Sequence, residues 1–195
     1  RVLFVVHRGQ LARQTKKDAG HEVRCQGRKW EIVCITGIDG NGQTELVCGL
    51  SGLEPLKSGS ISMNGKDITK ASIRERSVSG MSHIPEDRHK HGLILDYLLE
   101  DNMVLQRYFE PQFTSQFGFL KRKEIREYSD RLIEKYDIRS GQGSSTMVRS
   151  MSGANPQKAI IAREIDKNQD FLIAVQPTRG VYIGAIEFLN KQLIG

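Results

Sequence analysis

The segment that most constrains this chain is a glycine-rich stretch, Gly37–Thr44 (GIDGNGQT), which follows the apolar run Glu31–Thr36. Its spacing matches the pattern G-x-x-x-x-G-K-[ST]. In that pattern backbone N–H groups cradle phosphate oxygens, the Lys neutralises the β- and γ-phosphates, and the hydroxyl holds magnesium. Gln43 stands at the Lys position. We therefore expect a strand, a phosphate-binding loop and a helix, in that order, with weaker phosphate binding than the complete pattern gives.

Two interpretations of this loop remain open from its residues. Without its Lys, the segment could be an ordinary strand-to-helix turn, because glycine is the usual residue where φ is positive. A helix that begins near Gly42 nevertheless directs unpaired N–H groups and a positive dipole end into the loop, and these bind anions without a Lys. On this second interpretation the loop binds a nucleotide but supports catalysis poorly. Its binding residues are then Gly37, Asp39, Gly40, Asn41, Gly42, Gln43 and Thr44, with Thr44 also a weak magnesium ligand.

Charge and hydropathy narrow the class of protein. The net charge is +6, but basic and acidic residues are interleaved, as in Lys121–Glu127, which is typical of a solvated helix face. We therefore expect no nucleic-acid partner. No apolar run approaches the roughly 18 residues that a membrane-spanning helix needs. Work at a membrane would thus require a partner protein.

Hydrophobic periodicity predicts an α/β protein with a mainly parallel sheet, because short apolar runs alternate with helical patterns. A hairpin is expected around Asn64-Gly65. A charged helix should bury Ile125, Tyr128, Leu132 and Tyr136 on one face. The predicted strands are Val2–Val6, Glu31–Thr36, Met81–Ile84 and Phe171–Val175; the helices are Thr44–Leu50, a helical region Leu93–Tyr136, Ala159–Ile165 and Ala185–Leu193; Glu86–Gly92 is expected as a loop and Gly141–Ser145 as a flexible linker.

Four motifs occur in a specific order along the chain: Gly37–Thr44 (GIDGNGQT), His83–Arg88 (HIPEDR), Ser152–Lys158 (SGANPQK) and Gln176–Gly180 (QPTRG). With these motifs the chain resembles ABC-transporter ATP-binding domains. It is most similar to the second of two fused domains in importers of simple sugars and nucleosides, over about residues 22–195. The glycine-rich loop alone would not distinguish this family.

The resemblance implies a P-loop NTPase fold of ABC type: a RecA-like core, an antiparallel β subdomain and an inserted helical subdomain at approximately residues 90–160. Residues 1–195 would form a single truncated domain of this kind, with ATP and Mg²⁺ as cofactors. Two such domains pair head to tail, so the implied partners are a first ABC ATPase domain, membrane permease subunits and, indirectly, an extracellular substrate-binding protein. The implied location is the cytoplasmic face of the membrane.

The resemblance also assigns a role to Ser152 and Gly153, as the signature motif that completes the partner domain's ATP site. The residues support this role physically. A helix that follows them can accept Pro156 in its first turn, and its N-terminus would point toward a γ-phosphate. An ordinary helix start remains the alternative.

Departures from the active pattern concentrate after the strand Phe171–Val175. Val175 and Gln176 stand where an active domain has Asp for magnesium and Glu for the attacking water, and neither can do that work. Glu86 occupies the sensor position, as in the second domains of fused importers. We therefore expect this half not to hydrolyse ATP alone, with Gln176 a degenerate catalytic position. A soluble ABC-type ATPase that acts on nucleic acid or ribosomes, and an inactive remnant, are the alternatives.

Overall fold

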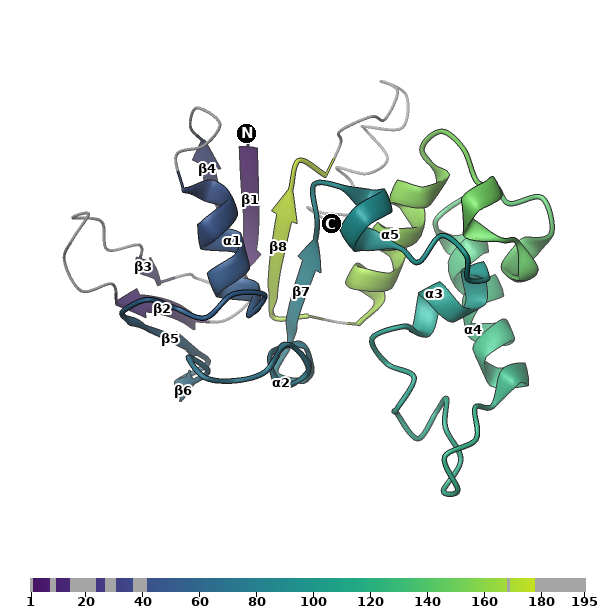
Figure 1. Ribbon diagram of the computed structural model, residues 1–195, viewed down its shortest axis with the longest axis horizontal. Helices are drawn as coiled ribbons and strands as arrows, with labels where there is room; N and C mark the ends of the chain where they lie inside the picture. The colour runs from purple at the N-terminus through teal and green to yellow at the C-terminus, as the bar shows by residue number, and fades with distance from the viewer. Residues whose placement is uncertain are drawn as a thin grey trace. The chain divides into compact units, whose positions relative to one another are not determined.

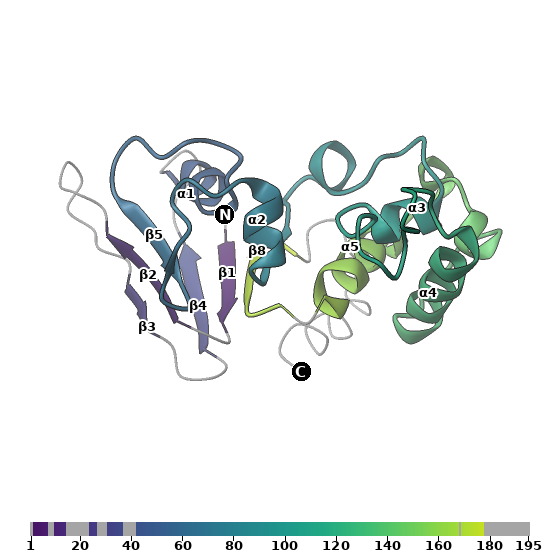
Figure 2. The ribbon, with the colours of Figure 1, turned by 90° about the horizontal axis from the view of Figure 1, so that it is seen from below.

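The computed structural model describes residues 2–7, 10–14, 24–26, 31–36, 42–167 and 169–177. The chain divides into two compact units. The first comprises residues 1–83 and 167–176, and the second comprises residues 84–166 and 177–195 (Figures 1 and 2). Along the sequence the chain therefore passes from the first unit to the second, returns to the first for residues 167–176, and enters the second again.

The first unit contains a four-stranded sheet in the order β4-β1-β8-β7, formed by β1 (Val2–His7), β4 (Glu31–Thr36), β8 (Phe171–Val175) and β7 (Met81–Ile84). All four strands lie where the sequence predicts them. The prediction of a mainly parallel sheet is wrong here, because β1 pairs antiparallel with both β4 and β8. Alternation of strands and helices sets direction only where a helix crosses between neighbours, and among the described residues no helix lies between β1 and β4. β7 and β8 point the same way in Figure 1.

A second sheet in this unit is antiparallel in each of its pairs and has the order β3-β2-β5-β6. β5 (Ser60–Met63) and β6 (Lys66–Asp67) form the predicted hairpin, with positive φ at both Asn64 and Gly65. Two positive φ values at the turn match the right-handed twist of the flanking strands. β2 (Gln10–Gln14) and β3 (Arg24–Gln26) were not predicted.

The core of the first unit forms between helix α1 (Gln43–Ser51) and strands of both sheets. It consists of Val47, Leu50, Ile61, Met63, Ile68, Met81, Phe171 and Ile173. A short helix, α2 (Ile73–Val78), begins with a capping box in which Ser72 and Glu75 satisfy each other's backbone N–H groups. α1 thus sits at the centre of this unit's apolar packing.

The second unit is helical and contains α3 (Leu99–Val104), α4 (Arg122–Lys135) and α5 (Asn155–Asp166). The predicted buried face of α4 is confirmed, since Ile125, Tyr128, Leu132 and Tyr136 are all buried. Short 3₁₀ turns occupy Gly143–Ser145 and Val148–Ser150. Among the part of the chain that the structure describes, no helix is long and apolar enough to cross a membrane.

Several helical boundaries differ from the sequence prediction. The region Leu93–Tyr136 is two helices separated by irregular backbone, and α5 begins four residues before Ala159. Gly141–Ser145 ends in a 3₁₀ turn instead of forming a flexible linker. The predicted helix Ala185–Leu193 lies outside the described residues.

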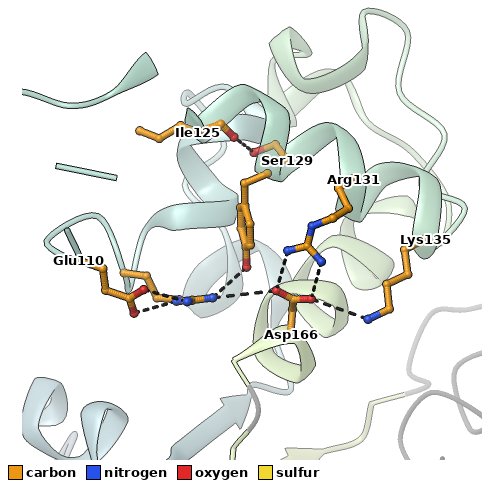
Figure 3. A network of polar contacts seen from close by, with 8 residues as sticks. Glu110, Ile125, Ser129, Arg131, Lys135 and Asp166 are labelled. Atoms are coloured by element: carbon orange, nitrogen blue, oxygen red, sulfur yellow. Dashed lines mark hydrogen bonds and ion pairs between the residues drawn. The ribbon is translucent and has the colours of Figure 1, made fainter. Parts of the chain in front are cut away.

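A network of ion pairs fastens the end of α5 to α4 (Figure 3). Arg131 donates to both carboxylate oxygens of Asp166 at 3.2 Å, and Lys135 Nζ lies 3.7 Å from Asp166. Arg107 lies 4.0 Å from the same carboxylate and pairs with Glu110 at 2.8 Å. A carboxylate at a helix C-terminus opposes the helix dipole, so these cations offset an unfavourable position while they join the two helices.

Candidate nucleotide-binding and signature segments

The ends of β4 and β8 lie at one edge of the first sheet. Leu3 on β1 pairs with Ile35 on one side and with Val175 on the other. β4 and β8 therefore run in the same direction, and their carboxyl ends are about 10 Å apart, two strand spacings. Ligands of α/β sheets bind beyond the carboxyl ends of such strands. The sheet thus brings Thr36, the last residue of β4, and Gln176, the residue after β8, to the same edge.

The glycine-rich loop leads into α1, whose first turn is described while Gly37, Asp39, Gly40 and Asn41 lie outside the described residues. Gly42 caps α1 with a left-handed φ of 91°, and its carbonyl accepts the N–H of Leu46 at 2.9 Å. Gln43 is buried and Thr44 is exposed. A left-handed residue at this point lets the first N–H groups of α1 face the loop. The roles assigned to these residues by sequence stay predictions.

The other end of α1 is held by a buried guanidinium. Arg76 on α2 donates to the carbonyls of Gly49 and Leu50 at 2.8 and 2.7 Å, and to those of Thr69 and Ala71 at 2.9 Å each. The carbonyls of Gly49 and Leu50 lie in the last turn of α1, where helix geometry leaves carbonyls without partners and positive charge is favourable. Burial lowers the pKa of Arg76. The contacts fix the direction of α1, and with it the direction of its N-terminus.

Val175 and Gln176 occupy the end of β8 and the position after it. Val175 packs against the apolar core of the first unit, so this position serves packing and offers no oxygen to a metal. Gln176 is half-buried and adopts a left-handed φ of 46°. Such a φ is uncommon for a residue with a side chain and often marks a functional turn.

The segment that follows β7 was predicted as a loop but forms a π-helical turn, Arg88–Gly92. The carboxylate of Asp87 accepts the N–H groups of His89 and Lys90 at 3.0 Å, and the N–H of Leu93 reaches the carbonyl of Arg88. These hydrogen bonds from Lys90 and His89 lower the pKa of Asp87. Asp87 is therefore committed to capping, and the half-buried Glu86 precedes the cap.

Ser152 and Gly153 lie on the surface, directly before α5. Gly153 has a left-handed φ of 65°, and a Cβ placed there would meet nothing within 4 Å. Ala154 is buried, so its methyl group is covered by the chain itself. Ser152 and Gly153 present an open turn at a helix start.

Three side chains of α5 hold this turn in place. The Asn155 amide accepts the N–H of Arg139 at 2.9 Å and donates to the Ser152 carbonyl at 3.1 Å. Lys158 is buried, and its ammonium donates to the carbonyl and the carboxylate of Asp137, at 2.5 and 2.7 Å. Gln157 donates to the carbonyl of Pro177 at 2.8 Å. α5, which begins directly after Ser152 and Gly153, is thus tied to Asp137 after α4 and to Pro177.

Sequence reasoning missed Asp137, Arg139 and Arg76 as supports of these segments. Asp137 has a left-handed φ of 48°, which Asp tolerates better than most residues. The position of Asp137 just after an amphipathic helix indicates a helix end. The sequence does not indicate that Asp137 pairs with Lys158, which lies 21 residues further along the chain. Arg76 gave no signal, because a basic residue in a polar stretch usually faces solvent.

The fold and these segments define a class, the ATP-binding cassette. Solved cassettes of this kind have the same fold. The dimeric post-hydrolysis structure of the cassette MJ0796, bound to ADP and Pi, aligns with a TM-score of 0.64 and 15% identity, over 97% of this chain and 81% of that one. A nucleotide-free cassette from an ABC transporter aligns with a TM-score of 0.63 and 12% identity, over 100% and 76%.

The family model described as ABC transporter matches residues 21–179, and the chain belongs to that family. It is 48% identical over 167 residues to the nucleoside import ATP-binding protein NupA of Lactococcus lactis subsp. cremoris, and 49% identical over 164 residues to the guanosine import ATP-binding protein NupO of Bacillus subtilis. A putative carbohydrate transport ATP-binding protein of Mycoplasma pneumoniae is 39% identical over 166 residues. These matches cover 84–86% of this chain but only 29–33% of each relative, so the chain spans about a third of their length.

Proposed function

We propose that this chain is an ATP-binding half of an ABC importer for nucleosides or simple sugars. The observation that carries the proposal is the identity of nearly one half to two proteins named for nucleoside and guanosine import. The carbohydrate-transport relative is more distant, which favours a nucleoside over a sugar as the cargo. The proposed location is the cytoplasmic face of the membrane, with permease subunits and, indirectly, a substrate-binding protein as partners.

Residues 1–195 form, in this proposal, one truncated nucleotide-binding domain whose helical subdomain is approximately residues 90–160. It acts as the second half of an ATPase pair, beside a first domain that keeps the catalytic Lys and Glu. ATP with Mg²⁺ binds at the carboxyl edge of the β4-β1-β8 sheet, on the glycine-rich loop Gly37–Thr44. Thr44 contributes the magnesium ligand and Glu86 the sensor side chain.

Hydrolysis at this edge is deficient, because three groups that drive it are replaced. Gln43 carries no positive charge for a transferring phosphoryl group, Val175 is packed in the core, and Gln176 lacks the basicity to activate water. Ser152 and Gly153 instead serve in trans. Their exposed turn meets the γ-phosphate held by the first domain, and α5 adds its positive dipole end.

Titration of the purified chain with a fluorescent ATP analogue in Mg²⁺ tests the binding half of the proposal. We expect saturable binding that weakens when Thr44→Ala removes the hydroxyl, and no phosphate release above the protein-free rate. Absence of saturable binding would contradict nucleotide binding. Robust ATP turnover by this chain alone would contradict the account of Gln43 and Gln176.

A further inference from the structure

The irregular segment between α3 and α4 carries two phenylalanines on the surface. Phe117 is 87% exposed and Phe119 is 74% exposed, and Leu120 beside them is also exposed. Phe113, four residues earlier, is fully buried against the ring of Tyr128, with centroids 5.0 Å apart. The same short segment thus anchors one aromatic ring in the core and presents two others to the outside. Adjacent exposed aromatic rings of this kind mark a binding surface.

The exposed rings are held by a structured turn. The Phe119 carbonyl accepts the N–H of Ser115 at 2.8 Å, and the Ser115 side chain accepts the N–H of Phe119 at 3.1 Å. Gly118 adopts a left-handed φ of 82°, and Thr114 forms a β-bridge with Leu120. We call residues Ser115–Leu120 the aromatic tip. Because the tip is already ordered, binding through it needs little additional loss of chain entropy.

Three cations follow the tip directly: Lys121, Arg122 and Lys123. No acidic residue occurs from Pro111 to Lys123, so this stretch carries a charge of +3. The ammonium of Lys123 is highly exposed and lies 3.9 Å from the exposed carboxylate of Glu127 on the next turn of α4. Arg122 pairs with Asp101, whereas Lys121 donates to the Pro111 carbonyl and has no acidic partner among the described residues. The combination is a set of apolar rings that would enter a nonpolar layer, beside charges that would stay at an anionic boundary.

We propose that the aromatic tip and Lys121–Lys123 together form a contact surface for an anionic lipid bilayer. Phe117 and Phe119 enter the headgroup region, and the cations lie at the level of the phosphates. Anionic headgroups complement this surface because each cation near them strengthens binding about fivefold, while exposed aromatic rings gain from leaving water. A hydrophobic groove on a protein would accommodate the aromatic rings, but it would not by itself provide negative charge opposite Lys121, Arg122 and Lys123.

Sedimentation of the purified chain with protein-free vesicles tests this inference without permease or nucleotide. In about 0.1 M salt, where the Debye length is about 10 Å, we expect binding to vesicles that contain anionic phosphatidylglycerol and little binding to neutral phosphatidylcholine vesicles. Phe117→Ser with Phe119→Ser should reduce binding at least tenfold. Lys121→Gln with Lys123→Gln should reduce binding to anionic vesicles about tenfold or more. The matched control, Leu53→Ser with Val78→Ser, removes two exposed apolar side chains from the first unit and should change nothing.

A second measurement reports insertion directly. The variant Phe119→Trp keeps an aromatic ring at the tip. Brominated lipid in anionic vesicles should quench its fluorescence more than that of the parent chain, whose single tryptophan is Trp30. Equal sedimentation of the tip variant and the parent chain, or absence of quenching, would overturn the inference. Loss of binding to detergent-solubilised permease, with vesicle binding absent throughout, would show a protein-docking surface and would also overturn it. None of these outcomes bears on nucleotide binding.

Discussion

The ammonium of Lys158 lies 2.7 Å from the carboxylate of Asp137, with the Lys buried and the Asp exposed. This pair joins the first turn of the signature helix α5 to the end of α4. Its two members are unequal, because removal of the Asp leaves a buried charge, whereas removal of the Lys leaves an acid in water. The structure therefore predicts unequal effects for variants on its two sides.

Asp137→Asn should lower the free energy of unfolding by about 1–2 kcal/mol, because it leaves the buried ammonium without its charged partner. Asn also tolerates the left-handed backbone, so the change isolates the charge. Lys158→Met should cost less than this. Urea unfolding at pH 7 measures both, and a larger loss for Lys158→Met would contradict the assignment.

The Lys158–Asp137 pair should also make the stability of the protein depend on pH in the acidic range. The hydrogen bond and charge of Lys158 lower the pKa of Asp137. Its contribution to stability is therefore complete above the ordinary Asp pKa of about 4 and is lost as the pH falls through the lowered value. Asp137→Asn should flatten the decline of stability on that acid limb, whereas Asp130→Asn, at an exposed position on α4, serves as the control.

The buried Tyr136 should make the stability of the protein depend on pH in the alkaline range. Its hydroxyl is buried without a hydrogen-bond partner among the described residues, and burial, then the charge of Asp166, raises its pKa to about 12. The folded protein binds this proton more tightly than the unfolded chain, so stability falls as the pH rises from about 10 to about 12. Tyr136→Phe should keep or increase stability at pH 7 and reduce the alkaline loss by about 2 kcal/mol. Identical alkaline unfolding of the two proteins would contradict the assignment.

Gly42 is predicted to be essential for the direction of α1. A Cβ there would meet no described residue within 4 Å, so we expect the cost of Gly42→Ala to come from its φ of 91° and to amount to about 1–2 kcal/mol. The shifted backbone should also weaken binding of the ATP analogue. Gly141→Ala, at another open position without a left-handed φ, is the matched control and should change neither quantity.

The sequence predicted local structure best where a residue type allows few backbone conformations. Asn64-Gly65 predicted a hairpin because both residues tolerate positive φ, and the structure confirms the turn. The α4 face was predicted by its period of 3.6 residues. The direction of β1 was not predictable, since pairing between distant strands depends on the whole sheet.

Prediction was weakest for the contacts that support the candidate site. The π-helical turn after β7 depends on a single carboxylate, Asp87, that could equally have faced solvent. Leu99 and Met103 on α3 are buried, whereas Tyr108, which follows in the same predicted helical region, is 47% exposed. Sequence spacing predicts which residues share the face of a helix. It does not predict where a helix ends and irregular backbone begins, and residues beyond that point no longer lie on the buried face.

Restoring the missing cation tests the account of the glycine-rich loop. Gln43→Lys places an ammonium at the position that neutralises the β- and γ-phosphates and should tighten binding of the ATP analogue about tenfold or more. It should restore no turnover, because Val175 and Gln176 are unchanged. Unchanged affinity in a folded variant would indicate that residue 43 does not face phosphate.

The most direct test of the division of labour is the ATPase rate of this chain co-expressed with an ABC domain that retains the catalytic Lys and Glu and associates with it. Ser152→Arg should lower turnover at least tenfold, because a bulky side chain would block the turn that we propose meets the partner's γ-phosphate. Gln176→Ala and the exposed control Ser58→Arg should change turnover less than twofold. The claim that this chain acts through Ser152 and Gly153 would be contradicted if Ser152→Arg left the turnover of the two associated domains unchanged and Gln176→Ala abolished it.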